Sequence, residues 1–188
     1  MGLDKARIPF RGRPLAEHVA SVLAEVVSEV VLLSRDADDP RFPGWTIVPD
    51  RRPGEGPLAG LESALDHAGG RAVFLAACDL PGLTSELIRH VVGSGRALEE
   101  LLRSPRAEAR VPVFEDRLQP VVALYSPACL AEVEAALERG ERALYRLLER
   151  IHTTPVRLTP ELPFYHPTLL HNVNSPSDLQ LYERDRQI

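Results

Sequence analysis

The spacing of hydrophobic residues along this 188-residue chain switches between a pattern typical of helices and a pattern typical of buried strands. Short apolar runs predict strands over residues 29–34, 45–48 and 71–77, since runs of this length suit buried strands better than helices. Apolar residues three or four positions apart predict helices that alternate with these strands. Three apolar stripes carry the helix predictions: Leu15, Val19, Val22, Leu23 and Val26; Leu58, Leu61 and Leu65; Leu87, Ile88, Val91 and Val92.

The second half of the chain adds an antiparallel piece. Arg110–Phe114 and Gln119–Tyr125 flank a short polar turn, which predicts a hairpin. Pro112 and Pro120 cannot donate ladder hydrogen bonds, so we expect them at edges or strand ends. Further patterns predict helices over 97–102, 127–139 and 142–151, a strand over 154–158, and a terminal helix from residue 176.

These elements together predict the fold class. Strands that alternate with helices up to residue 92 favour a three-layer α/β domain with a mostly parallel sheet, and the hairpin makes that sheet mixed. The length suits one domain over residues 1–188.

The run from Ala72 to Pro81 is the part of the chain that carries candidate chemistry most clearly. Its apolar residues end at Asp79, and Leu80-Pro81 then stops a simple continuation. Ligands of open α/β sheets bind at the carboxyl ends of the strands, where a carboxylate can hold Mg²⁺ against nucleotide phosphates. The competing interpretation is that Asp79 only caps the following turn or helix.

A loop rich in glycine and proline, residues 51–57, leads directly into the helix that starts near Leu58. Such a junction exposes backbone N–H groups that can bind an anion. Most loops of this composition are only turns, so the pattern alone leaves both interpretations open.

Composition excludes several classes of protein. The formal net charge is −5 and there is no long basic run, which argues against a nucleic-acid partner. The two cysteines, Cys78 and Cys129, match no metal-ligand spacing and are expected to be thiols in a reducing cytosol. No apolar run approaches the ~20 residues of a membrane span, and the first residues are no signal peptide. We therefore expect a cytoplasmic protein with no membrane partner.

Five short motifs, in this order, make the chain similar to the molybdenum cofactor guanylyltransferases, which are nucleotidyltransferases with a Rossmann-like fold. A sixth family segment is similar to residues 119–125. The five motifs are Asp4-Lys5, Gly12-Arg13-Pro14-Leu15, Gly56-Pro57-Leu58-Ala59-Gly60, Cys78-Asp79-Leu80-Pro81 and Asn172-Val173-Asn174-Ser175-Pro176.

The resemblance implies transfer of GMP from GTP to the terminal phosphate of molybdopterin, with release of pyrophosphate. It implies that Asp79 is catalytic and holds Mg²⁺, that Lys5 supplies positive charge to the triphosphate, and that Asp50 binds guanine. Asn172 and Asn174 would lie near the second substrate or the metal. The residues that would line the nucleotide side are Gly56, Pro57, Leu58, Ala59 and Gly60.

Simpler interpretations of the same residues stay open. Lys5 could be a solvated lysine, Asp50 could only end a strand, and the two asparagines could form a turn before a capped helix. His166 and His171 are close in sequence, but no third zinc ligand is evident near them.

The chain differs from the family at its start. The family begins with a hydrophobic strand and a glycine-rich loop that wraps the nucleotide, and only Met1-Gly2 corresponds to the end of that loop. We expect the first strand and the loop to be missing from this chain, through an internal start or a rearranged sheet. Their loss would impair GTP binding.

Two other functions compete with guanylyl transfer. One is transfer of another nucleotide, such as CMP, or the use of another phosphorylated acceptor. The other is a non-catalytic protein that binds or delivers molybdenum cofactor, with molybdoenzymes or their chaperones as partners.

Overall fold

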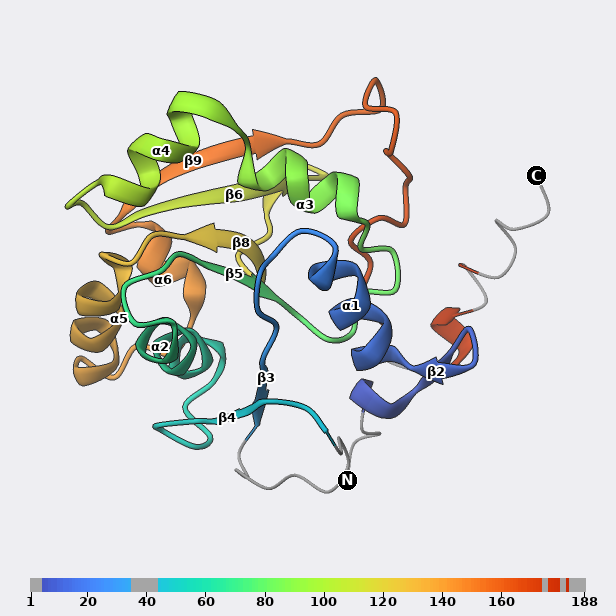
Figure 1. Ribbon diagram of the computed structural model, residues 1–188, viewed down its shortest axis with the longest axis horizontal. Coiled ribbons are helices and arrows are strands. Elements are labelled where there is room, and N and C mark those ends of the chain that lie inside the picture. The colour runs from blue at the N-terminus through green and yellow to red at the C-terminus, as the bar shows by residue number, and fades with distance from the viewer. Residues whose placement is uncertain (1–4, 35–43, 174–175, 180–181, 183–188) are drawn as a thin grey trace. The chain divides into compact units, whose positions relative to one another are not determined.

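The computed structural model describes residues 5–34, 44–173, 176–179 and 182, which belong to two compact units (Figure 1). Unit 1 comprises residues 1–30, 76–90 and 158–188, and unit 2 comprises residues 31–75 and 91–157. Each unit thus combines segments that are distant in sequence. The single domain over residues 1–188 stays a prediction.

A five-stranded mixed sheet is the main element of unit 2 (Figure 1). Strand β6 pairs antiparallel with β7 and β8 and parallel with β9, and β5 lies beside β8. Strands β3 and β4 form a separate parallel pair. The α/β fold class is confirmed, although antiparallel pairing takes a larger share than the sequence predicted. The strands are β3 (Leu32–Ser34), β4 (Ile47–Pro49), β5 (Val73–Ala76), β6 (Glu108–Phe114), β7 (Arg117–Leu118), β8 (Val122–Tyr125) and β9 (His152–Arg157).

Pro112 corrects one prediction, because it lies inside β6, which is paired on both sides, and not at an edge. The antiparallel partner is interrupted opposite this residue: β8 pairs with residues 109–110 and β7 with residues 113–114. The interruption removes the need for a Pro112 N–H donor, and the Pro112 carbonyl still accepts a hydrogen bond from the Gln119 amide at 2.9 Å. Of the predicted hairpin strand over 119–125, only Val122–Tyr125 forms a strand, β8, and β7 (Arg117–Leu118) lies just before the predicted range.

Helices α2, α5 and α6 of unit 2 contribute to one hydrophobic core. Helices α2 and α5 pack against each other, and Leu61, Val111 and Val133 are completely buried in the core. Helix α2 ends at Gly69, whose left-handed backbone conformation is the common way to close a helix. The helices are α2 (Pro57–Ala68), α4 (Gly95–Arg103), α5 (Cys129–Glu138) and α6 (Leu144–Leu148).

Unit 1 begins with elements that the apolar pattern did not predict. A 3₁₀ turn, η1 (Lys5–Arg7), precedes a two-stranded hairpin of β1 (Pro9–Phe10) and β2 (Arg13–Pro14). Arg11 and Gly12 form its turn, both with positive φ angles of 50° and 81°. The hairpin leads directly into α1 (Leu15–Ala24).

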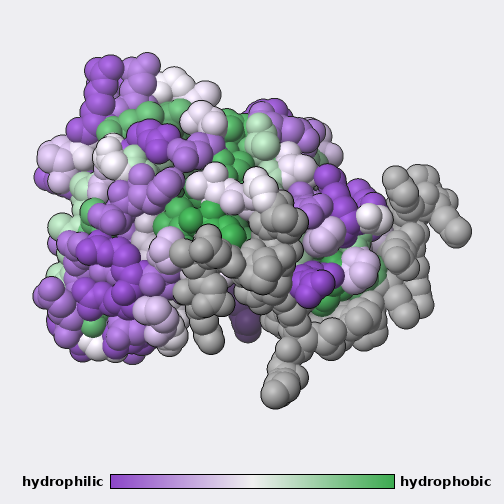
Figure 2. Space-filling view, turned by 60° about the horizontal axis from the view of Figure 1, so that its bottom comes forward, coloured by the Kyte–Doolittle hydropathy of each residue, from purple (hydrophilic) through white to green (hydrophobic). Residues whose placement is uncertain are grey.

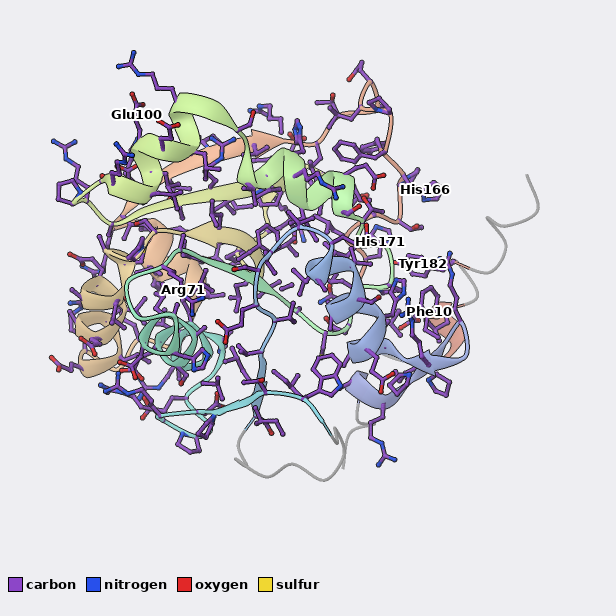
Figure 3. The ribbon with its side chains drawn as sticks, in the orientation of Figure 1. Phe10, Arg71, Glu100, His166, His171 and Tyr182 are labelled. Carbon is purple, nitrogen blue, oxygen red and sulfur yellow. The ribbon has the colours of Figure 1, made fainter. Side chains whose placement is uncertain are left out.

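A small core joins the two ends of the chain within unit 1. It contains Ile8, Phe10, Leu15, Val173, Leu179 and Tyr182. The Phe10 and Tyr182 rings meet edge to face at 6.2 Å, and Figure 3 shows the two side chains next to each other. The predicted terminal helix starts at Pro176 as a 3₁₀ turn, η2 (Pro176–Leu179), and Tyr182 is α-helical.

Helix α3 (Ser85–Val92) contains the predicted apolar stripe, and the Thr84 hydroxyl caps its start by accepting a hydrogen bond from the Leu87 amide at 3.2 Å. In the part of the chain that is described, none of the helices is long and apolar enough to span a membrane. Figure 2 shows that hydrophilic residues make up much of the visible surface, with hydrophobic residues exposed in smaller areas.

Candidate functional site

Asp79 lies in the loop that follows β5, at the carboxyl end of that strand, as the sequence predicted. Its side chain is 8% exposed, and a carboxylate is rarely buried to this degree unless it has a structural or chemical role. The backbone of the loop is anchored to the C-terminal segment, since the Val173 amide donates a hydrogen bond to the Asp79 carbonyl at 2.9 Å. The predicted Asn172-Val173-Asn174 motif therefore contacts the Asp79 loop through its middle residue.

His18, on the first turns of α1, holds the next part of the loop. Its Nε2 lies 3.2 Å from the Pro81 carbonyl oxygen, and its Nδ1 lies 3.2 Å from Nη2 of Arg13. The imidazole is 6% exposed and packs edge to face on Phe10 at 4.8 Å. Burial, followed by the nearby Arg13 and Arg11 guanidinium groups, lowers the pKa of His18, although the bond to Pro81 opposes the shift.

Gly82 continues the loop where no larger residue fits. A Cβ atom on Gly82 would lie 2.7 Å from the carbonyl oxygen of Leu169. The segment around Leu169 is itself held by Tyr182, whose hydroxyl contacts the carbonyl oxygens of Thr168 and His171 at 2.8 and 2.7 Å. Burial raises the pKa of Tyr182, so this hydroxyl keeps its proton. Figure 3 shows Tyr182 beside His171.

A pocket of about 450 Å³ in unit 1 borders the same loop. Pro81, Gly82 and Leu83 contribute one part of its lining, and the start of α3 contributes Thr84, Ser85 and Glu86. Side chains of both charges line the pocket: Arg11 is basic, and Glu25 and Glu86 are acidic. The remaining lining residues are His18, Val22, Phe164, His166, Thr168, Leu169 and Tyr182.

Asp50 follows β4 directly, also at the carboxyl end of a strand. Its amide donates to the Ser34 carbonyl at 2.8 Å, which extends the β3–β4 pairing by one bond. The next amide, of Arg51, donates at 2.9 Å to the hydroxyl of Ser63 on α2. The loop is thus attached to the helix that follows it.

Two ion pairs hold the rest of this loop. Arg52 bonds Glu62 of α2 at 3.2 Å, and the Glu62 side chain is only 1% exposed. Glu55 pairs with Arg142 at 3.1 Å. Sequence reasoning missed Glu62 and Ser63, which lie among the apolar positions of α2 and read as ordinary helix residues.

The start of α2 limits which atoms of residues 56–60 can contact a nucleotide. The Leu58 and Ala59 side chains are 0% and 1% exposed and belong to the core, so only their backbone can reach a ligand. Pro57 has no N–H, and the amides of Ala59 and Gly60 point to the Gly56 carbonyl. Anion binding at this helix end is therefore restricted to the amides of Gly56 and Leu58.

The predicted site residues are divided between the units. Asp79 and the exposed Asn172 lie in unit 1, and Asp50 and residues 56–60 lie in unit 2. Lys5 is described only by its backbone in η1, and Asn174 lies outside the described residues. Convergence of these residues on one crevice stays a prediction.

A single carboxylate such as that of Asp79 is compatible with a magnesium ion that a nucleotide brings with it. Mg²⁺ binds through one or two carboxylates plus phosphates and water, and does not need an all-protein cage. Among the described residues there is no group of three or more His, Cys, Asp or Glu side chains that could hold a metal. His166, one of the two histidines weighed for zinc, accepts at Nδ1 from the Thr168 amide at 3.2 Å.

Comparison with known proteins shows the family of this chain. Residues 1–154 match the family described as the MobA-like NTP transferase domain. A probable molybdenum cofactor guanylyltransferase of Deinococcus radiodurans is 39% identical over 95% of this chain and 84% of that protein. The chain belongs to the molybdenum cofactor guanylyltransferase family.

A second relative and one solved structure add to this comparison. The probable molybdenum cofactor guanylyltransferase of Methanothermobacter thermautotrophicus is 31% identical over 96% of this chain and 91% of that protein. The crystal structure of molybdopterin-guanine dinucleotide biosynthesis protein A from Archaeoglobus fulgidus superposes with a TM-score of 0.76. That match covers 98% of this chain and 91% of the other at 24% identity, and shows the shared fold.

Proposed function

We propose that this protein transfers GMP from GTP to the terminal phosphate of molybdopterin and releases pyrophosphate. The observation that carries the proposal is the buried carboxylate of Asp79, anchored at a strand end, in a chain whose relatives are named molybdenum cofactor guanylyltransferases. GTP and molybdopterin would be its substrates, and Mg²⁺ its cofactor.

The chemistry explains why these residue types are needed. A phosphate oxygen of the acceptor attacks the α-phosphorus of GTP, the bond to the bridging oxygen breaks, and pyrophosphate leaves. Several negative charges meet in this step, so catalysis depends on positioning and on cations. Mg²⁺, when bound, neutralises charge on the phosphates.

Each site residue has a part in this proposal. Asp79 would hold the Mg²⁺, and Lys5 would add a positive charge to the triphosphate. The Asp50 carboxylate would accept hydrogen bonds from guanine N–H groups, and the amides of Gly56 and Leu58 would contact phosphate. Asn172 and Asn174 would contact the acceptor or the metal.

Guanylyl transfer can be tested with GTP labelled at the α-phosphate, molybdopterin and Mg²⁺. Asp79→Asn is expected to lower the rate by roughly 10²–10³, the usual effect of removing one group that stabilises charge in the transition state. Asp116→Asn is the matched control, since Asp116 lies in the β6–β7 turn with its side chain 98% exposed. A folded Asp79→Asn protein with the wild-type rate would exclude Asp79 as the metal-holding residue.

Calorimetry with GTP, CTP and molybdopterin, each with Mg²⁺, separates the competing functions. Tight GTP binding with weak CTP binding supports guanylyl transfer. Tighter CTP binding would indicate cytidylyl transfer, and molybdopterin binding without nucleotide binding would indicate a delivery protein.

A further inference from the structure

We infer that His18 is a positioning residue for nucleotidyl transfer: its imidazole holds the Pro81 carbonyl and so sets the place of the Asp79 loop. This inference rests on the proposed function, because it gives Asp79 the role of holding Mg²⁺. His18 belongs to none of the motifs that relate the chain to its family.

The geometry defines one form of the ring. Nε2 must carry the proton in order to donate to the Pro81 carbonyl, 3.2 Å away. Nδ1 then has a lone pair that accepts from Nη2 of Arg13, also at 3.2 Å. Neutral imidazole offers one donor and one acceptor at opposite sides of the ring, and both are used here.

The packing around the ring keeps it in this place. His18 lies in the first half of α1 and is 6% exposed, and its ring meets the Phe10 ring edge to face with the ring centroids 4.8 Å apart. Arg13 comes from β2, which the turn at Gly12 brings back against β1. The hairpin and the helix together thus present an oriented donor to the loop.

Backbone contacts also hold the loop. The Val173 amide holds the Asp79 carbonyl, the Leu83 amide bonds the Leu80 carbonyl at 3.2 Å, and Gly82 packs against the Leu169 backbone. Among the described residues, His18 provides the one side-chain hydrogen bond to the Pro81 carbonyl that the structure shows. A mutation can therefore remove this contact without touching Asp79.

The role follows from the sensitivity of phosphoryl transfer to position. A shift of about 1 Å in a catalytic group can cost about 10²-fold in rate. Without His18, the Pro81 end of the loop loses its anchor while the Asp79 carboxylate is still present. We expect the loop to sample other positions and the Mg²⁺ requirement to rise.

The experiment compares His18→Leu and His18→Gln with wild type and Asp79→Asn. Leucine fills the space without hydrogen bonds, whereas glutamine can donate to Pro81 and accept from Arg13. Ser21→Ala is the matched control on α1, since the Ser21 hydroxyl bonds the His18 carbonyl at 2.7 Å and leaves the imidazole in place. The readouts are the half-saturating Mg²⁺ concentration for GTP binding, kcat and KM separately, melting temperature, and hydrogen exchange of the Val173 amide.

For His18→Leu we expect a half-saturating Mg²⁺ concentration about tenfold higher, a kcat about tenfold lower with little change in KM, and faster exchange at Val173. In His18→Gln, the half-saturating Mg²⁺ concentration, kcat and Val173 exchange should return most of the way to wild type. In Ser21→Ala, all three should equal wild type even if the melting temperature falls. Two results would overturn the positioning role alone. One is a wild-type Mg²⁺ dependence in His18→Leu. The other is a Ser21→Ala protein with the same melting temperature as His18→Leu and the same rise in half-saturating Mg²⁺ concentration. Wild-type Mg²⁺ dependence in Asp79→Asn would exclude Asp79 as the metal-holding residue, and this inference would fall with that role, whereas failure to transfer GMP at all would overturn the proposed function itself.

Discussion

The loop around Asp79 in unit 1 and the loop over residues 50–56 in unit 2 both follow the carboxyl end of a strand, but different forces hold them. The Asp79 loop is held by backbone hydrogen bonds, a close backbone contact at Gly82 and a neutral imidazole. The other loop is held by side chains: Ser63 and Glu62 of α2, and Arg142, which lies just before α6.

This difference indicates that the two loops respond to different changes. The close backbone contact of Gly82 leaves no room for an added side-chain atom. The hydrogen bonds of the His18 imidazole depend on its protonation and therefore on pH. Ion pairs at partly exposed positions respond to salt and lose little when one of them is removed. The variants below use this contrast, in order of decreasing effect.

The largest effect is expected from adding one methyl group to the Asp79 loop, compared with adding one to α2, the helix that follows the second loop. Gly82→Ala places a Cβ 2.7 Å from the Leu169 carbonyl oxygen, so the backbone must move, at a cost of about 3 kcal/mol. Gly60→Ala meets only the flexible Leu33 side chain at 3.4 Å, and alanine favours the helix by about 1 kcal/mol. Urea unfolding of both variants measures the contrast, and equal stability of the two would contradict it.

The second effect concerns the buried end of one ion pair. Glu62→Gln removes the charge that Arg52 contacts, and we expect a loss of about 2 kcal/mol, since hydrogen bonds to charged groups contribute about 1.5–3 kcal/mol. Glu55→Gln is the matched control, because the Glu55 side chain is 33% exposed and Glu62 only 1%. Chemical denaturation measures the free energy of unfolding of both variants. A larger loss in Glu55→Gln than in Glu62→Gln would contradict the expected order.

The third effect is a dependence on pH that arises from His18. Its pKa is lowered in the folded protein, so the unfolded chain takes up a proton first as the pH falls below the usual value of 6.5. Stability should therefore fall below about pH 6.5, by at most about 1.4 kcal/mol per pH unit from this group. His18→Gln should lose less stability than wild type between pH 7.5 and pH 5.5, and parallel losses would contradict the prediction.

The smallest effect is expected at the exposed end of the second loop. Arg51 pairs with Asp66 at 3.5 Å and Glu134 at 3.4 Å, with all three side chains at least 40% exposed. Arg51→Ala should cost less than about 1 kcal/mol, and less still at high salt. The measurement is the melting temperature of wild type and Arg51→Ala, with and without about 0.5 M salt, which screens exposed charges strongly. A loss that does not depend on salt would indicate that Arg51 acts by packing.

The sequence determined most helices and strands because their apolar periodicity is local. Helices α1, α2, α3 and α5 lie where their apolar stripes predicted, and β5 ends before Asp79. The family and its α/β fold followed from short motifs in a set order, because each motif consists of residues that are adjacent in the sequence. The sequence also placed Asp50 and Asp79 at strand ends.

Tertiary structure alone decided which distant residues meet. The hairpin before α1 depends on two consecutive positive φ angles, which the apolar pattern does not encode. Pro112 is tolerated inside a paired strand only because its partner strand is interrupted opposite it. The bond from His18 to Pro81 joins residues 63 positions apart, and no local pattern distinguishes such a histidine from an ordinary core residue. Periodicity reports which face of an element is buried, and the atoms that this face meets are known only once the chain is folded.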